Sequence, residues 1–475
     1  MIRRRSLVLG LLCMAVALSA SPQPGRNGAG LDAFQGALAK EGFDAHAAPM
    51  TFVDLAQQYC AGTMASAQFM NLDAPYLAVR PWKSAEELQT ESQLAIGTPP
   101  IPPASEAFRL RPDEAIVLIG LTPPPAKYFS YTPYLMRKAY PQGIAKSFSS
   151  LGDSVNLRTI HAPGTPFNQP IVLIFTPDRG TDARVRHALQ VAGYPVSIIH
   201  TVVIPSSMLN LGLGAGADTL VIAQRIAQWQ DPAAGASYLA HPSLTGFRVT
   251  PRASATPDPF PVPPLRVRGT GRTEMDLMNK LGELRAGIIE ANPALSATEY
   301  VARPVAYDGY DYIQRAADPF GDTRDTLYLA AGYFPPLGWT DAMTLADDEF
   351  LIVYGPNHVA TGKVTYVNIN AYSSVKGQLA LGSVYDDQLF GTAAPYLQPG
   401  DPAADLMYVY KLAKDCHGES NCLSLSTGGC PRLPALGDAD PLMVVIRSYL
   451  EPSTRVGPAY TEMLYDRVIK FSPRR

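Results

Sequence analysis

The sequence predicts an α+β protein with a β-rich, sandwich- or barrel-like body, and three observations indicate this class. Short apolar segments rich in Val, Ile and Tyr recur from residue 326 to the end of the chain. Three such segments follow one another within residues 350–384, a spacing that predicts an antiparallel meander. Helical periodicity between about residues 180 and 295 predicts a helical insertion in this body.

Composition limits the kinds of protein that this chain can be. It has 475 residues, of which 47% are hydrophobic and 17% are charged, as is typical of globular domains rather than disordered chains. The formal net charge is −3, and nucleic-acid binding needs a basic surface. We therefore expect no nucleic-acid partner.

The N-terminus has the three parts of a secretory signal peptide. Arg3, Arg4 and Arg5 precede an apolar run over residues 7–18, and small residues follow at positions 19 and 20. The run is shorter than the roughly 20 residues that span a bilayer, and no later segment predicts a transmembrane anchor. We expect cleavage near residue 20 and a periplasmic or secreted protein. Export through the general or the twin-arginine route stays open, as does lipidation at Cys13.

Breaks in composition predict the domain organisation. After the signal peptide (residues 1–20), residues 21–104 are expected to form a helical or irregular wrapping segment. Residues 105–250 predict an α/β segment, and residues 251–272 a Pro-rich linker. Residues 273–475 predict an amphipathic helix followed by a β-rich domain. No internal sequence repeat is evident.

Individual elements follow from periodicity and from breaks at Gly and Pro. The expected helices cover residues 31–41, 52–60, 84–95, 182–191, 217–230 and 273–291. Residues 115–121 and 127–132, on either side of a proline run, predict a pair of strands. The remaining expected strands cover residues 171–175, 197–204, 326–331, 350–355, 363–372, 379–384, 406–412, 442–449 and 467–471.

Four cysteines follow the predicted signal peptide. An even number in an exported chain favours disulfides, and three of the four lie close together, so one bridge is expected to be local. Cys60 then reaches the remaining partner among Cys416, Cys422 and Cys430. The alternative is a metal site formed with His417, but the spacing lacks the C-x2-C pair of structural zinc sites. We therefore predict disulfides and no metal.

The candidate catalytic residues lie at one end of the predicted meander. His358 occupies the loop after the first strand, and Asp386 and Asp387 follow the third. In a meander these two ends share an edge of the sheet, so His358 is expected to be a base or ligand and an aspartate its orienting partner. The competing interpretation is an exposed loop histidine near solvated acids.

The middle strand supplies the predicted substrate platform. Alternation places Tyr366, Asn368 and Asn370 on one face, and aromatic rings with amides suit a sugar or another small polar ligand. An ordinary solvent-facing sheet has the same pattern. Asp178 and Arg179 end a buried strand and form a second-rank site.

These observations predict an exported enzyme that acts on a small or carbohydrate-like substrate at the His358 rim. The alternative is a non-catalytic exported ligand-binding or envelope protein that uses the same face. No cofactor is assigned.

Overall fold

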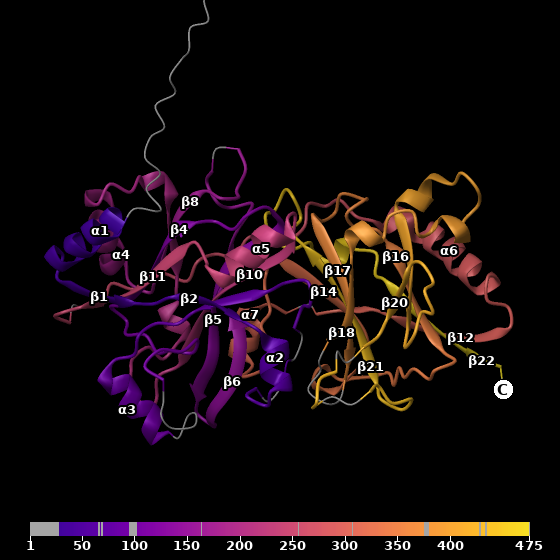
Figure 1. Cartoon of the computed structure of the whole chain (residues 1–475), viewed down its shortest axis with the longest axis horizontal. Helices are drawn as coiled ribbons and strands as arrows, with labels where there is room; N and C mark the ends of the chain where they lie inside the picture. Colours follow the sequence, from indigo (N-terminus) through magenta and orange to yellow (C-terminus); the bar gives the residue numbers. More distant parts are fainter. Residues whose placement is uncertain are drawn as a thin grey trace, which may run out of the picture.

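The computed structural model describes residues 28–474, except 65–66, 68–69, 95–101, 163, 255, 306, 375–379, 427–428 and 433–434. The predicted signal peptide and most of the connection between the expected strands at residues 363–372 and 379–384 lie outside these residues. The described chain forms two lobes that lie side by side (Figure 1). We call residues 28–251 the N-terminal lobe and residues 275–474 the C-terminal lobe.

The N-terminal lobe contains two sheets. The outer sheet has the order β1 (Phe43–Ala47), β11 (Leu244–Pro251), β4 (Ala115–Leu121), β8 (Pro170–Thr176) and β9 (Ile199–Val203). The inner sheet has the order β2 (Met50–Val53), β3 (Tyr76–Val79), β10 (Thr219–Trp229), β5 (Ala126–Tyr140) and β6 (Gly143–Ser150), with β7 (Val155–Asn156) paired to β5.

The C-terminal lobe repeats this arrangement. Its outer sheet has the order β12 (Leu295–Val301), β22 (Arg467–Pro473), β16 (Phe350–Pro356), β19 (Met407–Ala413) and β20 (Cys422–Ser424). Its inner sheet has the order β13 (Arg303–Pro304), β14 (Thr326–Phe334), β21 (Leu442–Tyr449), β17 (Tyr366–Ser373) and β18 (Ala380–Tyr385), with β15 (Trp339–Thr340) paired to β14.

The main paths of the sheets therefore share one topology in chain order, and β7 and β15 are the strands without an equivalent. In each outer sheet the last pair is parallel (β8 with β9, β19 with β20) and the other pairs are antiparallel. In both main paths of the inner sheets every pair is antiparallel. The chain is thus a structural duplication, although no repeat is evident in its sequence.

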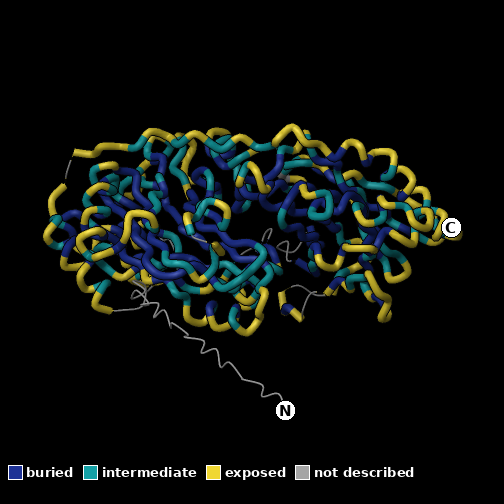
Figure 2. The backbone as a smooth tube through the Cα atoms, turned by 90° about the horizontal axis from the view of Figure 1, so that it is seen from above, coloured by how far each residue is buried: buried dark blue, intermediate teal, exposed yellow. Residues whose placement is uncertain are grey.

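Helices cover the outer sheets, and the inner sheets face each other. In the N-terminal lobe α1 (Gly28–Lys40) and α4 (Arg179–Val191) pack on the outer sheet, and in the C-terminal lobe α6 (Met278–Glu290) does so. The sandwich cores lie between the two sheets of each lobe, where Figure 2 shows buried backbone. The remaining helices are α2 (Leu55–Cys60), α3 (Ala85–Gln93), α5 (Pro232–Ala240) and α7 (Gly309–Gln314).

Each lobe sends one short helix onto the other. The segment containing α2, between β2 and β3, places Tyr59 and Met70 in the core of the C-terminal lobe. The equivalent helix α7, between β13 and β14, places Ile313 in the core of the N-terminal lobe. Close approach is essential at Gly309, where an added Cβ would lie 2.2 Å from the Ser150 carbonyl oxygen. The lobes are therefore joined by a reciprocal exchange of arms.

The predicted α+β, sandwich-like body is confirmed, and none of the four described sheets closes into a barrel. The strands expected in the C-terminal region are present, and β17 and β18 form the expected hairpin. Two expected strand pairs are wrong, because β16 pairs with β19 and β22 rather than β17, and β4 pairs with β8 and β11 rather than β5. In both cases the chain passes from the outer to the inner sheet. The full meander therefore does not form.

The helical region is also corrected. The helix expected over residues 217–230 is strand β10, because its two faces are both buried and the strand lacks polar alternation. Residues 180–295 do contain most of α4 and all of α5 and α6, but β9, β10 and β11 lie among them and complete the sheets of the N-terminal lobe. The helices are therefore interleaved with the sandwich rather than inserted into it.

Candidate functional site

His358 lies in the loop after β16 and is buried, with 1% of its surface exposed. Its Nδ1 atom is 2.9 Å from both carboxylate oxygens of Glu274, and its Nε2 atom is 3.3 Å from Oδ2 of Asp466. The hydroxyl of Tyr408 donates to Asp466 at 2.5 Å, and that of Thr361 donates to Glu274 at 2.7 Å. We call these five residues the His358 centre.

The charges of the His358 centre are matched. Burial lowers the pKa of His358, but the carboxylates of Glu274 and Asp466 outweigh burial and raise this pKa to about 10. Burial raises the pKa of Glu274, but His358 outweighs it, so that the net pKa of Glu274 is lowered. At neutral pH the histidine is an imidazolium held between carboxylates, so it lacks the free lone pair of a general base.

Asp386 and Asp387 are not the hydrogen-bond partners of His358. Lys127, on β5 of the other lobe, donates to Asp386 at 2.6 Å and to Asp387 at 2.5 Å. The expected pairing with His358 is wrong because it rested on a β16–β17 hairpin, whereas β16 lies in the outer sheet and β18 in the inner one. The two aspartates instead form an ion pair between the lobes.

The predicted substrate platform is buried between the lobes. Tyr366, Asn368 and Asn370 lie on one face of β17 as expected, but each is less than 1% exposed. The amide of Asn368 donates to Oδ1 of Asn71 in the N-terminal lobe at 2.8 Å. Tyr366 packs against Tyr449 with ring centroids 5.3 Å apart. These side chains are part of the junction and do not form an open sheet face.

Asp178 and Arg179 have local roles in this structure. Asp178 caps α4, since its Oδ1 atom accepts a hydrogen bond of 2.7 Å from the amide of Thr181. Arg179 is half-exposed and pairs with Asp258. The sequence placed both residues correctly at the end of β8, but their contacts are those of a helix cap and a surface ion pair.

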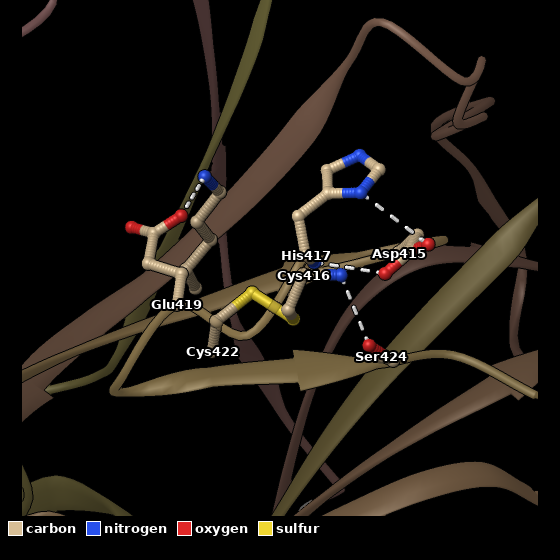
Figure 3. Close-up of a disulfide and its surroundings, with 7 residues drawn as sticks. Asp415, Cys416, His417, Glu419, Cys422 and Ser424 are labelled. Atoms are coloured by element: carbon tan, nitrogen blue, oxygen red, sulfur yellow. Dashed lines mark hydrogen bonds and ion pairs between the residues drawn. A yellow bond between two sulfur atoms is a disulfide. The ribbon is translucent and has the colours of Figure 1, made fainter.

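The predicted disulfides are confirmed. Cys416 and Cys422 form the local bridge (Figure 3), and Cys60 bonds to Cys430 across 370 positions of sequence. Cys60 ends α2, so this bridge ties the exchanged arm of the N-terminal lobe to the C-terminal lobe. His417 is exposed beside Asp415 (Figure 3). Within the described residues, no group of three or more potential ligands is arranged to hold a metal ion.

Two buried arginines at equivalent positions are the residues that sequence reasoning missed. Arg225 on β10 lies opposite Tyr76 on β3, and Arg447 on β21 lies opposite Tyr328 on β14. The β5 and β17 neighbours of the two arginines are Ser130 and Asn368. The only sequence signal was an arginine within each of two apolar segments. We call Arg225 and Arg447 the arginine pair.

Tyrosine rings surround both members of the arginine pair in the same way. The Arg225 guanidinium lies 5.4 and 5.5 Å from the ring centroids of Tyr76 and Tyr134. The Arg447 guanidinium lies 5.8 and 5.6 Å from those of Tyr328 and Tyr372. At such distances the ring faces attract the cations. The duplication therefore extends from the strand order to this cluster of side chains.

Reciprocal carboxylates accompany the arginines. Asp73 lies three residues before Tyr76 and accepts a hydrogen bond from Ser383 in the other lobe. Asp325 lies three residues before Tyr328 and accepts from Tyr128 and from Asn156, both in the other lobe, at 2.8 Å. Burial raises the pKa of Asp325 to about 6. Each lobe thus contributes a carboxylate to the inner sheet of its neighbour.

A pocket opens at the junction between the lobes. Both arginines line it, together with Tyr328, Asp322 and the half-exposed Tyr307. The volume available to the centres of water molecules in this pocket is about 50 Å³. This is room for about four waters. This pocket, which we call the junction pocket, is the candidate binding site.

A second pocket lies beside the His358 centre. It has a volume of about 200 Å³ and is lined by Glu274, Thr361, Lys363, Arg272 and Asp276, among others. Lys363 is already bonded to the carboxylates of Glu451 and Glu462. The charge of Lys363 is therefore neutralised, and Arg272 donates to the Thr361 carbonyl oxygen.

Comparison with known proteins identifies no family. No family model matches the chain, and no curated protein matches it. Similar solved structures include an uncharacterised protein from Burkholderia cenocepacia, with 9% identity and a TM-score of 0.38 over 93% of this chain and 87% of that one. The VPA0106 protein from Vibrio parahaemolyticus has 11% identity and a TM-score of 0.39 over 94% of this chain and 99% of that one. Likenesses at this level support no functional argument.

Across the described residues, no helix combines the length and apolar character that crossing a membrane requires.

Proposed function

We propose that the protein is an exported, non-catalytic binding protein that holds a small polar ligand in the junction pocket. One observation carries this proposal: each lobe contributes a buried arginine, at equivalent positions, to the lining of the same pocket. Small-molecule sites are commonly clefts between domains with a few convergent polar groups. The size of the interior suits a ligand of only a few heavy atoms.

Export is supported by the two disulfides and by the N-terminal sequence. Disulfides persist in oxidising compartments, and the bridges involve all four cysteines that follow the predicted signal peptide. We expect protein purified from the periplasm or the medium to begin near Ser21. Its intact mass should increase by about four hydrogens on reduction, one pair for each bridge. A chain that retains residues 1–20, or contains four free thiols, would contradict export with disulfide formation.

Binding in the junction pocket is tested by thermal melting with a fixed panel of glucose, glycerol, glycine, acetate and phosphate. We expect at least one compound to raise the melting temperature of the native protein. Ligand at 100 times its Kd stabilises the native state by about 2.7 kcal/mol. The variant Ala330→Leu narrows the pocket and should lose the response.

The duplication provides a matched control for this test. Ala78 occupies the position in β3 that Ala330 occupies in β14, as the strand registers show, but it is outside the junction pocket. Ala78→Leu should therefore keep the response that Ala330→Leu loses. No response to any compound, or equal loss in both variants, would refute binding at the junction pocket.

We keep an exported enzyme as a second candidate, because the 200 Å³ pocket reaches Glu274 in the His358 centre. The test is a screen with chromogenic esters and glycosides. Glu274→Gln should abolish any turnover, whereas Asp276→Asn, in the same pocket but not bonded to His358, should retain it. Absence of turnover in the native protein, or equal rates in all three proteins, would eliminate this candidate.

A further inference from the structure

We infer that the ligand of the junction pocket is a small oxyanion, a carboxylate or phosphate group held between Arg225 and Arg447. This inference rests on the proposed function and names the chemical class of its ligand. Three features of the junction support this inference. The guanidinium of Arg225 has a donor without an acceptor within the described residues, Arg447 brings a second guanidinium to the pocket, and the aspartates that line the pocket already make other interactions.

The buried Arg225 partly offsets the rise in the pKa of Asp322 through its charge, but it forms no direct ion pair within the described residues. It is 5% exposed, and among the described residues no carboxylate oxygen lies within 4.0 Å of its side-chain nitrogens. One terminal nitrogen donates to the Gly321 carbonyl oxygen, while the buried Nε atom has no hydrogen-bond partner in the part of the chain that the structure describes. A buried charge without a partner is costly, and a bound anion at this position would supply the missing acceptor.

Arg447 brings a second guanidinium to the same pocket. It donates to the Tyr372 hydroxyl at 2.6 Å, and like Arg225 it lines the pocket. A guanidinium presents a planar fork of donors that matches the paired oxygens of carboxylate and phosphate groups. Two such forks from opposite lobes provide the donors of an oxyanion clamp.

The acids that line the pocket are already engaged. Asp308 pairs with Arg268 and Arg324, and Asp322 accepts hydrogen bonds from the amide and hydroxyl of Ser150 at 2.8 and 2.7 Å. Burial also raises the pKa of Asp322 to about 6, which weakens its charge below that pH. The lining contains three arginines (Arg225, Arg268 and Arg447) and two aspartates (Asp308 and Asp322), so positive charge is in excess.

The size of the pocket restricts the ligand further. Room for about four waters accommodates acetate, glycolate or inorganic phosphate, and excludes a nucleotide or an oligosaccharide from full enclosure. Tyr307 lines the pocket and is half-exposed, so one side of the pocket lies near solvent. A larger molecule would therefore enter only with its anionic group.

The test is titration of the full-length mature protein with sodium acetate and with sodium phosphate, against sodium chloride at equal ionic strength. We expect acetate or phosphate to raise the melting temperature and give saturable heat in calorimetry, and chloride to do neither. A response to acetate alone identifies a carboxylate, and one to phosphate alone identifies a phosphate group. If chloride raises the melting temperature as much as acetate and phosphate do, the inference is overturned.

Variants locate the anion. Arg225→Lys keeps the charge but loses the fork, and should weaken binding at least tenfold. Arg303→Lys is the control, because Arg303 is outside the pocket and is paired with Asp341, and the affinity of this variant should change less than threefold. Equal losses in the two variants would overturn the assignment to Arg225.

A direct measurement covers the case in which Arg225→Lys does not fold. Crystals of the native protein soaked in selenate should give an anomalous peak between Arg225 and Arg447, and a peak elsewhere or none overturns the inference. If glucose or glycerol binds the native protein but not Ala330→Leu, while no oxyanion binds, the proposed function stands and the oxyanion assignment falls. If nothing in the panel binds, both fail.

Discussion

The His358 centre and the arginine pair are both buried groups of charges, but they differ in how those charges are satisfied. His358 has a carboxylate at each ring nitrogen, and both carboxylates accept further hydrogen bonds. Arg225 has a single backbone acceptor and borders a pocket. The comparison indicates that burial and perturbed charge alone do not identify a site. The distinguishing feature is an unsatisfied donor next to open space.

The largest expected effect is at His358. Replacing it with alanine leaves Glu274 and Asp466 buried without their shared cation, and removing one partner of a buried ion pair typically costs about 3–5 kcal/mol. Urea unfolding of His358→Ala should show this loss of stability. The exposed His417 is the control, and His417→Ala should change stability by less than about 0.5 kcal/mol. A His358→Ala protein as stable as the native one would show that the centre is not a structural ion pair.

The dependence of stability on pH sharpens the same contrast. The folded pKa of His358, about 10, exceeds its ordinary value of 6.5, so its stabilising contribution is complete below pH 6.5 and is lost as pH rises towards 10. Chemical unfolding between pH 6 and 10 should therefore show falling stability, and His358→Gln should lack this component. An equal slope in both proteins would contradict the raised pKa.

Two buried carboxylates at the junction should also make the protein more stable as pH falls, but over a lower pH range than His358. Burial raises the folded pKa values of Asp322 and Asp325 to about 6, so their charged forms are unfavourable above that pH. Stability should increase as pH falls through 6 towards their unfolded pKa of 3.8. Unfolding measurements on Asp325→Asn should show a smaller increase than the native protein over this range.

The arginine pair should respond to substitution in the opposite way from His358. Arg225→Met replaces a buried cation that has no direct ion pair within the described residues with an apolar side chain of similar length, so the variant no longer has the cost of burying that charge. We expect a stability change of about 1 kcal/mol or less in either direction, together with loss of oxyanion binding. Urea unfolding and acetate titration of the same sample measure the two effects. A loss as large as that of His358→Ala would place the arginine pair among the structural ion pairs.

The smallest effect is expected at Asp387, which pairs with Lys127 across the lobes near solvent. Its side chain is largely exposed, and ion pairs of this kind are typically worth about 0–1 kcal/mol. Asp387→Asn should therefore lower stability by no more than about 1 kcal/mol in urea unfolding at low salt. A larger loss would mean that this ion pair, rather than the exchanged arms, holds the lobes together.

Sequence reasoning located most strands but mispaired them at one recurrent position. Both β4–β5 and β16–β17 were expected to be hairpins, and the two connections are equivalent in the duplicated topology. Each passes from the outer to the inner sheet, so the adjacent strands do not pair. Spacing along the chain favours local pairing, and it contains no information about a change of sheet. The proposed pairing of His358 with Asp386 failed for this reason.

Burial on both faces explains the other errors. β10 has apolar residues on both faces, and one of them, Ala227, packs with Tyr366 and Tyr449 of the other lobe, so the alternation that marks a half-buried strand is absent. The face of β17 was assigned correctly from alternation, but a sequence does not state what covers a face. The cysteines were easier, because an even number and their clustering restrict the pairings.

The long disulfide has a consequence for the covalent structure of the molecule. Cys60 precedes the exposed, Pro-rich connection at residues 252–272, and Cys430 follows it, so the bridge closes a covalent ring that contains the connection. A single proteolytic cut there would open the ring without releasing a fragment. Such a nicked protein would run as one species without reductant and as two with it, and both arms would keep their attachments after the cut.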